Sequence, residues 1–122
     1  MRALVIDDSR AMRAILRNLL KGLGYEVVEA ANGKEALARL IESGPVEVAL
    51  VDWNMPEMNG YEFVVACRQN RAWDSVRLLM CTTETEMSQV LKALEAGANE
   101  YVMKPFTREI IQEKLAMLGI AA

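Results

Sequence analysis

Short apolar runs alternate along the chain with longer stretches in which apolar residues recur every three or four positions. The short runs are typical of buried strands, and the periodic stretches are typical of amphipathic helices. Five such pairs follow one another, with strands expected at residues 3–7, 26–29, 46–52, 76–82 and 101–103. This alternation predicts an α/β fold built on a parallel sheet with five helices.

Two of the expected strands contain runs without any polar residue, Val48 to Val51 and Leu78 to Cys81. Runs of this kind are expected where helices cover both faces of a parallel sheet. Because crossovers between parallel strands are right-handed, we expect a doubly wound, flavodoxin-like sheet in the order 2-1-3-4-5. Ligands of such sheets bind outside the carboxyl ends of the strands, here between strands one and three.

Capping residues indicate where the helices begin and end. Asn32, Asn59 and Thr83 each precede a Glu by three residues, which is the pattern of a capping box. Gly44 and Pro45 predict the end of the second helix, because neither residue favours its continuation. The residues expected to face the core are Ala36, Leu37, Leu40 and Ile41 in the second helix, and Ile110 or Ile111, Leu115 and Leu118 in the fifth.

Length and composition narrow the classes of function. The 122 residues, 52% of them hydrophobic, suit a single domain spanning residues 1–122. A net charge of −3 argues against nucleic acid as a partner, and the apolar runs are too short to span a membrane. The chain has no histidine, which excludes His-based triads and His-ligated metals, and Cys67 and Cys81 are interpreted as buried, reduced thiols. We expect a cytoplasmic monomer.

Polar residues gather where the expected strands end: Asp7 and Asp8 after the first, Asp52 after the third, Thr82 after the fourth and Lys104 after the fifth. Three carboxylates within about 5 Å repel by roughly 3 kcal/mol per pair at an effective dielectric constant near 20. A divalent cation would relieve this repulsion, and oxygen ligands without His or Cys favour Mg²⁺. The pattern therefore predicts a magnesium site at this edge of the sheet.

Four segments in order carry a family resemblance: residues 7–9 (Asp-Asp-Ser), 52–60 (Asp-Trp-Asn-Met-Pro-Glu-Met-Asn-Gly), 81–84 (Cys-Thr-Thr-Glu) and 101–106 (Tyr-Val-Met-Lys-Pro-Phe). Together they closely resemble the receiver domains of two-component response regulators, over essentially the whole chain. Within that family the Asp-Trp-Asn-Met-Pro and Lys-Pro-Phe-Thr segments are most similar to single-domain chemotaxis regulators.

The resemblance implies roles for the clustered residues. Asp52 would be the phosphoacceptor, a carboxylate that needs no general base to act as a nucleophile at neutral pH. Asp8 and Asp52 would bind Mg²⁺ directly, Asp7 through a bound water or by orienting the site, and Asn54 through its backbone carbonyl. Lys104 would contact the phosphoryl oxygens.

The resemblance also implies a conformational switch. The Thr82 hydroxyl would donate to the phosphoryl group and draw in the loop after strand four, and Tyr101 would then turn inward and reshape the surface of helix four, strand five and helix five. The bond between Lys104 and Pro105 would be cis.

The function implied is that of a stand-alone receiver in chemotaxis or motility signalling, phosphorylated by a histidine kinase. Its target would be the flagellar motor switch or another signalling protein, and its only catalysis would be on itself. A phosphorelay intermediate that passes the group to a histidine phosphotransfer protein is an alternative. Two other classes fit less well: an aspartate-nucleophile phosphatase has two Asp separated by one residue, whereas Asp7 and Asp8 are adjacent, and an FMN carrier would need a glycine-rich phosphate loop after strand one.

Overall fold

The computed structural model describes residues 1–120, apart from the side chains of residues 84 and 85. Its sheet has five parallel strands in the order β2-β1-β3-β4-β5, which confirms the predicted topology. The strands are β1 (Arg2–Ile6), β2 (Glu26–Ala30), β3 (Val48–Asp52), β4 (Arg77–Thr82) and β5 (Glu100–Met103). Each of them lies within two residues of its predicted limits.

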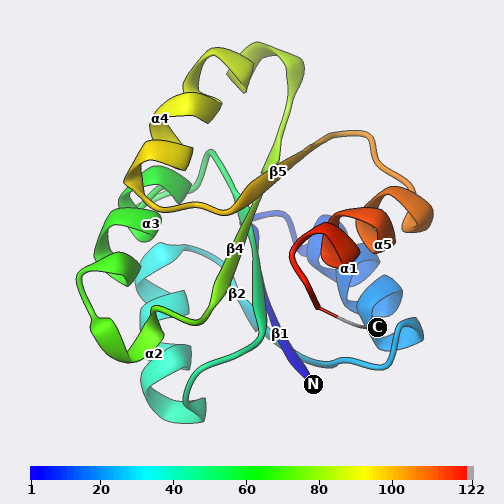
Figure 1. Cartoon of the computed structure of the whole chain (residues 1–122), viewed down its shortest axis with the longest axis horizontal. Coiled ribbons are helices and arrows are strands. Elements are labelled where there is room, and N and C mark those ends of the chain that lie inside the picture. The colour runs from blue at the N-terminus through cyan, green and yellow to red at the C-terminus, as the bar shows by residue number, and fades with distance from the viewer. Residues whose placement is uncertain (121–122) are drawn as a thin grey trace.

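Helices cover both faces of this sheet and complete three layers (Figure 1). The α-helices are α1 (Arg10–Gly22), α2 (Gly33–Ser43), α3 (Gly60–Arg68), α4 (Val90–Ala96) and α5 (Arg108–Met117), and two 3₁₀ helices are η1 (Arg71–Trp73) and η2 (Glu84–Gln89). Helices α2, α3 and α4 lie on one side of the sheet, and α1 and α5 lie on the other. The fold is therefore the doubly wound α/β arrangement expected from the sequence.

The core consists of two hydrophobic clusters, one on each side of the sheet. Alternate residues of β1 belong to different clusters: Leu4 and Ile6 pack with α2 and α3, whereas Ala3 and Val5 pack with α1 and α5. All four side chains are 1% exposed or less. This two-sided burial is the reason why the strand is apolar throughout.

The start of α3 holds the end of β3 in place. Asn59 and Glu62 form the predicted capping box, in which each side chain accepts a backbone N–H from the other residue, at 2.8 and 3.0 Å. Gly60 follows, and its N–H donates to the Trp53 carbonyl at 2.9 Å. A Cβ on Gly60 would lie 2.3 Å from the carbonyl oxygen of Asp52, so only glycine allows this close approach.

Three details differ from the sequence prediction. Ile41 is 74% exposed, because it lies about 100° further round α2 than the buried Leu40. In α5 only Ile111 and Leu115 are buried, whereas Leu118 is half-buried. The capping box at Thr83 forms, but the turn that it opens is the 3₁₀ helix η2 rather than the start of α4.

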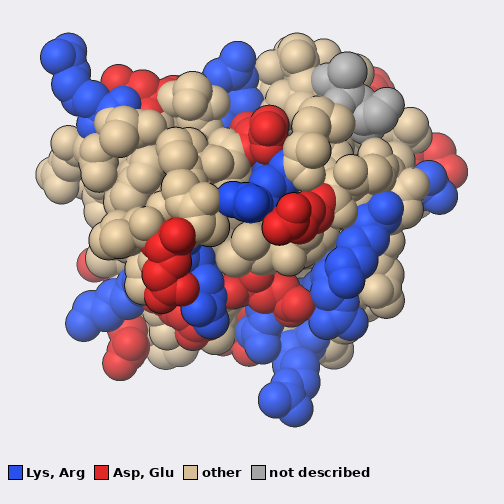
Figure 2. Space-filling model, turned by 90° about the horizontal axis from the view of Figure 1, so that it is seen from below, with Lys and Arg blue, Asp and Glu red and all other residues tan. Residues whose placement is uncertain are grey.

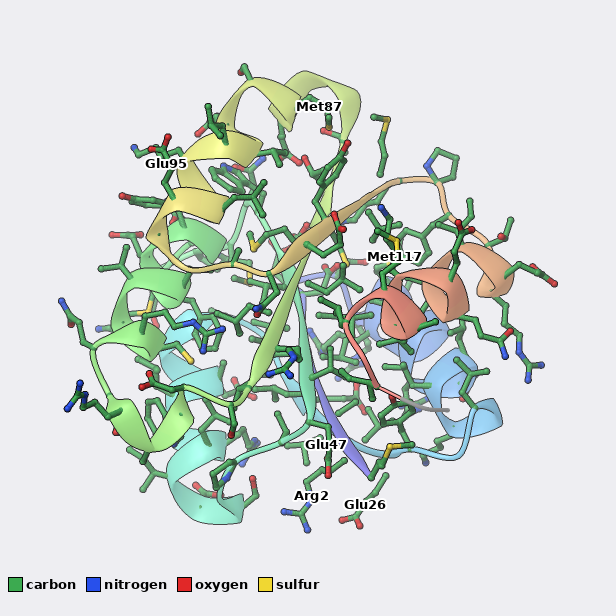
Figure 3. All side chains as sticks on the ribbon, in the orientation of Figure 1. Arg2, Glu26, Glu47, Met87, Glu95 and Met117 are labelled. Carbon is green, nitrogen blue, oxygen red and sulfur yellow. The ribbon has the colours of Figure 1, made fainter. Side chains whose placement is uncertain are left out.

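The amino edge of the sheet, opposite the carboxyl ends, carries charges of both signs interspersed (Figure 2). At its centre the Arg2 side chain forms an ion pair with Glu26 at 3.6 Å, and the Arg2 backbone N–H donates to the Glu47 carboxylate at 2.6 Å. Figure 3 labels these three residues at the lower edge of the molecule.

Cys67 and Cys81 are both buried and form no disulfide, in agreement with the sequence interpretation of their burial. Burial raises the pKa of the Cys67 thiol, and it raises the pKa of the Cys81 thiol to about 12. Among residues 1–120, no helix combines the length and the apolar character needed to cross a bilayer.

Candidate functional site

Three carboxylates meet at the carboxyl ends of β1 and β3. Ile6 pairs with Val51 in register, so Asp7 and Asp52 occupy the next position of the two strands. One carboxylate oxygen from each of Asp7, Asp8 and Asp52 lies within 4.8 Å of the others. Asp7 and Asp52 are 2% and 8% exposed, whereas Asp8 is exposed. The acidic cluster predicted from the strand ends is therefore present.

Lys104 enters the cluster from the end of β5. Its Nζ donates to Asp52 Oδ1 at 2.7 Å and lies 3.6 Å from Asp7 Oδ2. The peptide bond between Lys104 and Pro105 is cis, as the resemblance implied. The single ammonium leaves the three carboxylates with an excess of negative charge.

The environment of Asp52 opposes its ionisation. Burial raises the pKa of the Asp52 carboxyl, and the charges of Asp7 and Asp8 act in the same direction, against the hydrogen bond from Lys104. For Lys104, burial alone would lower the pKa, but the hydrogen bond and charge of Asp52, together with Asp7, raise it. The cluster therefore keeps Lys104 protonated and penalises the carboxylate form of Asp52.

Asp7 is oriented by its own loop and by α1. Its Oδ1 accepts the Ser9 N–H at 2.8 Å, and Arg13 Nη1 donates to the Asp7 carbonyl at 2.6 Å. Its Oδ2 is buried and accepts no hydrogen bond. A cation among the three carboxylates would satisfy this oxygen, so the residues present fit a hard divalent ion such as Mg²⁺. Arg13 was not expected at the site, although its place one turn after Ser9 offered a signal.

Thr82 ends β4, directly beside β3, since its neighbour Cys81 pairs with Asp52 in register. Thr82 is fully buried, and its Oγ1 donates to the Thr83 carbonyl at 3.1 Å. Tyr101 lies outside the cluster, half-buried on β5, with Lys114 Nζ 5.3 Å from its ring centroid. The structure thus brings Thr82 to the edge of the site and leaves Tyr101 on the outer strand.

The Asn54 side chain forms its hydrogen bond outside the acidic cluster. Its Nδ2 donates to Glu86 Oε2, and Glu86 Oε1 accepts the Thr83 N–H at 2.9 Å. Glu86 itself is 8% exposed. From the sequence, only the backbone carbonyl of Asn54 was assigned a role, and Glu86 was assigned only helix capping. The bond between their side chains joins residues 32 positions apart, so no local pattern indicated it.

The arrangement combines a buried carboxylate, two further carboxylates that could hold a cation with it, and an ammonium group bonded to the first. These are the parts that phosphoryl transfer to an aspartate requires, since positive charge must offset the charge of the phosphoryl oxygens.

Comparison with known proteins agrees with this geometry. The chain matches the family model of the response regulator receiver domain over residues 3–116. It is 44% identical over 119 residues to chemotaxis protein CheY1 of Helicobacter pylori, covering 97% of this chain and 96% of that protein. It is 45% identical over 116 residues to the chemotaxis protein CheY homolog of Campylobacter jejuni, covering 94% and 89%. The solved structure of chemotaxis protein CheY4 of Vibrio cholerae is similar with a TM-score of 0.88 and 36% identity, covering 96% and 97%.

Proposed function

The chain belongs to the response regulator receiver domains, as a CheY-like chemotaxis regulator, and on that premise we propose that it accepts a phosphoryl group on Asp52 from a histidine kinase. The observation that carries the proposal is the 2.7 Å contact from Lys104 Nζ to Asp52 Oδ1 inside a cluster of three carboxylates. No stabilising role accounts for three acidic groups around one ammonium.

In the transfer step, one oxygen of the Asp52 carboxylate attacks the phosphorus of the donor phosphohistidine. The new O–P bond forms as the N–P bond breaks, and the imidazole nitrogen of the donor leaves with the electron pair and takes up a proton. Lys104 stays protonated and contacts a phosphoryl oxygen, for which its raised pKa suits it. The product is an acyl phosphate, which water later hydrolyses.

Asp7, Asp8 and Asp52, with the backbone carbonyl of Asn54, would hold Mg²⁺ in this proposal. The bound ion supplies positive charge against the oxygens of the phosphoryl group. Asp7 is already oriented for this task by Ser9 and Arg13.

Phosphorylation of Asp52 would change the surface to which a downstream protein binds. The Thr82 hydroxyl would leave the Thr83 carbonyl and donate to the phosphoryl group, and Tyr101 would turn inward. A downstream protein, such as the flagellar motor switch, would bind the surface formed by α4, β5 and α5.

The chain would act as a stand-alone cytoplasmic receiver and as a monomer. Its only catalysis would be on itself. The chemotaxis names of its relatives favour this role over a relay to a phosphotransfer protein.

The test is labelling with a small acyl phosphate donor and Mg²⁺, followed by intact-protein mass spectrometry. Wild type should gain one phosphoryl group, and Asp52→Asn or a chelator should abolish the gain. Asp74→Asn is the matched control, because Asp74 is exposed at the end of η1. Label that persists in Asp52→Asn would refute the assignment of the acceptor.

A further inference from the structure

We propose that Glu86 is a latch that holds the unphosphorylated form by tying the loop after β4 to the loop after β3. This inference rests on the proposed function and adds a residue that controls the switch. Glu86 belongs to η2, in the segment that joins β4 to α4, which the neighbouring Met87 marks in Figure 3. It would be a positioning residue, because it acts on Thr83 and Asn54 and not on the reacting atoms.

The latch consists of two hydrogen bonds to one buried carboxylate, and a backbone hydrogen bond lies beside them. Glu86 Oε2 accepts Asn54 Nδ2, and Glu86 Oε1 accepts the Thr83 N–H at 2.9 Å. The Glu86 backbone N–H donates to the Thr83 carbonyl at 3.0 Å. A carboxylate only accepts, so it can satisfy donors from both loops at once.

These contacts resist the movement that the switch needs. The Thr83 carbonyl, which accepts the Glu86 backbone N–H, also accepts the Thr82 hydroxyl at 3.1 Å. For Thr82 to reach a phosphoryl group, its hydroxyl must leave this carbonyl and the loop must shift. The Glu86 carboxylate opposes the shift, because it holds the Thr83 N–H and anchors it to Asn54.

The same carboxylate responds to phosphorylation. Asn54 is two residues after Asp52, and Glu86 is 8% exposed, so its charge is poorly screened by solvent. A phosphoryl group on Asp52 adds negative charge on this side of the sheet and repels the Glu86 carboxylate. The repulsion favours release of the latch, and part of the free energy of phosphorylation is used to break these bonds.

The experiment is calorimetric titration of beryllofluoride, a phosphoryl mimic, into the full chain at saturating Mg²⁺. Glu86→Ala removes the latch and should tighten beryllofluoride binding by roughly fivefold or more, the lower range of coupling between sites. Glu86→Gln can accept only one of the two donors, so its affinity should lie between wild type and Glu86→Ala. Glu95→Ala is the matched control, since Glu95 is exposed on α4 (Figure 3) and its loss changes the net charge equally.

A double-mutant cycle isolates the contact with Asn54. If the two residues act through one bond, Asn54→Ala combined with Glu86→Ala should bind beryllofluoride no more tightly than Glu86→Ala alone. Thermal unfolding of each variant separates the latch from general support of the fold, because a merely structural role lowers stability without tightening binding.

Unchanged or weaker beryllofluoride binding in folded Glu86→Ala would overturn the latch. If Glu86→Ala does not fold, the nearly isosteric Glu86→Gln decides in the same way. Failure of the proposed function looks different, since wild type itself would then fail to bind beryllofluoride, or Asp52→Asn would bind it equally well.

Discussion

At the scale of single residues, Asp52 occupies a site that opposes its own charge. It is 8% exposed and faces Asp7 and Asp8, and one hydrogen bond from Lys104 offsets these effects only in part, so its pKa is raised. Natural proteins keep such unfavourable groups where function requires them. Because the environment is unfavourable, the negative charge of Asp52 should lower the free energy of unfolding of the protein.

We expect Asp52→Asn to raise the melting temperature by a few degrees at pH 7 without Mg²⁺. The raised pKa means that the folded state binds a proton more tightly than the unfolded state, so ionisation costs stability as the pH rises through the folded pKa. Below the unfolded pKa both states are protonated, and the gain should vanish. Thermal unfolding at a series of pH values measures this difference.

Asp74→Asn is again the control, because Asp74 is exposed and lies at η1. A lower melting temperature of Asp52→Asn at neutral pH would show that the bond to Lys104 outweighs burial and repulsion.

Much of the site could be predicted from the sequence because each of its parts follows a strand. Asp7, Asp8, Asp52 and Lys104 had to meet once the strand order was known, since the carboxyl ends of parallel strands share one edge. The bond from Asn54 to Glu86 could not be predicted in this way. It depends on how far the 3₁₀ turn carries the Glu86 side chain across the sheet edge, which no local pattern encodes.

At the scale of secondary-structure elements, Arg68 at the end of α3 bonds to two connections. One is the connection between α3 and β4, and the other is the connection between α4 and β5. Its guanidinium donates to four acceptors at 2.7–3.0 Å: the carbonyls of Gly97, Trp73 and Val76, and the side chain of Asn99. It also packs on Gly97, where a Cβ would lie 2.6 Å from Arg68 Cγ. One side chain thus satisfies backbone carbonyls from separate connections.

Arg68→Met should lower the free energy of unfolding by about 3 kcal/mol, because it leaves several partly buried carbonyls without a charged donor. Urea denaturation at pH 7 measures this loss. Arg71→Met, at an exposed position of η1, should stay within about 0.5 kcal/mol of wild type. Equal effects of the two substitutions would contradict the assigned role of Arg68.

The helices show where periodicity succeeds as a predictor and where it fails. Asn59 and Glu62 marked the start of α3 correctly, because a capping box is a local device. Ile41 was wrongly placed in the core, because an apolar residue beside a buried stripe need not turn inward. The 3₁₀ form of η2 was also not predicted, since the same capping residues can open either kind of turn.

At the scale of the whole molecule, the sheet separates two hydrophobic clusters that share only its strands. Ile6 belongs to the cluster beneath α2 and α3, and Ile111 belongs to the cluster beneath α1 and α5. Both side chains are 1% exposed or less. The two clusters are therefore expected to respond independently to small losses of volume.

Ile6→Val and Ile111→Val should each cost about 1 kcal/mol of unfolding free energy. The double variant should lose the sum of the two costs within about 0.5 kcal/mol, because the side chains lie on opposite faces of the sheet. Urea denaturation of the four proteins gives the coupling. A coupling free energy above about 1 kcal/mol would mean that the sheet transmits packing changes from one face to the other.

The burial of both cysteines has a practical consequence. Cys67 and Cys81 are 0% and 1% exposed, and each thiol has a raised pKa, so neither presents a reactive thiolate to reagents in solvent. A maleimide dye or a spin label should therefore attach selectively to a cysteine introduced on the outer face of α4, without removal of the native cysteines. Wild-type protein treated with the same reagent provides the blank for such spectroscopic studies.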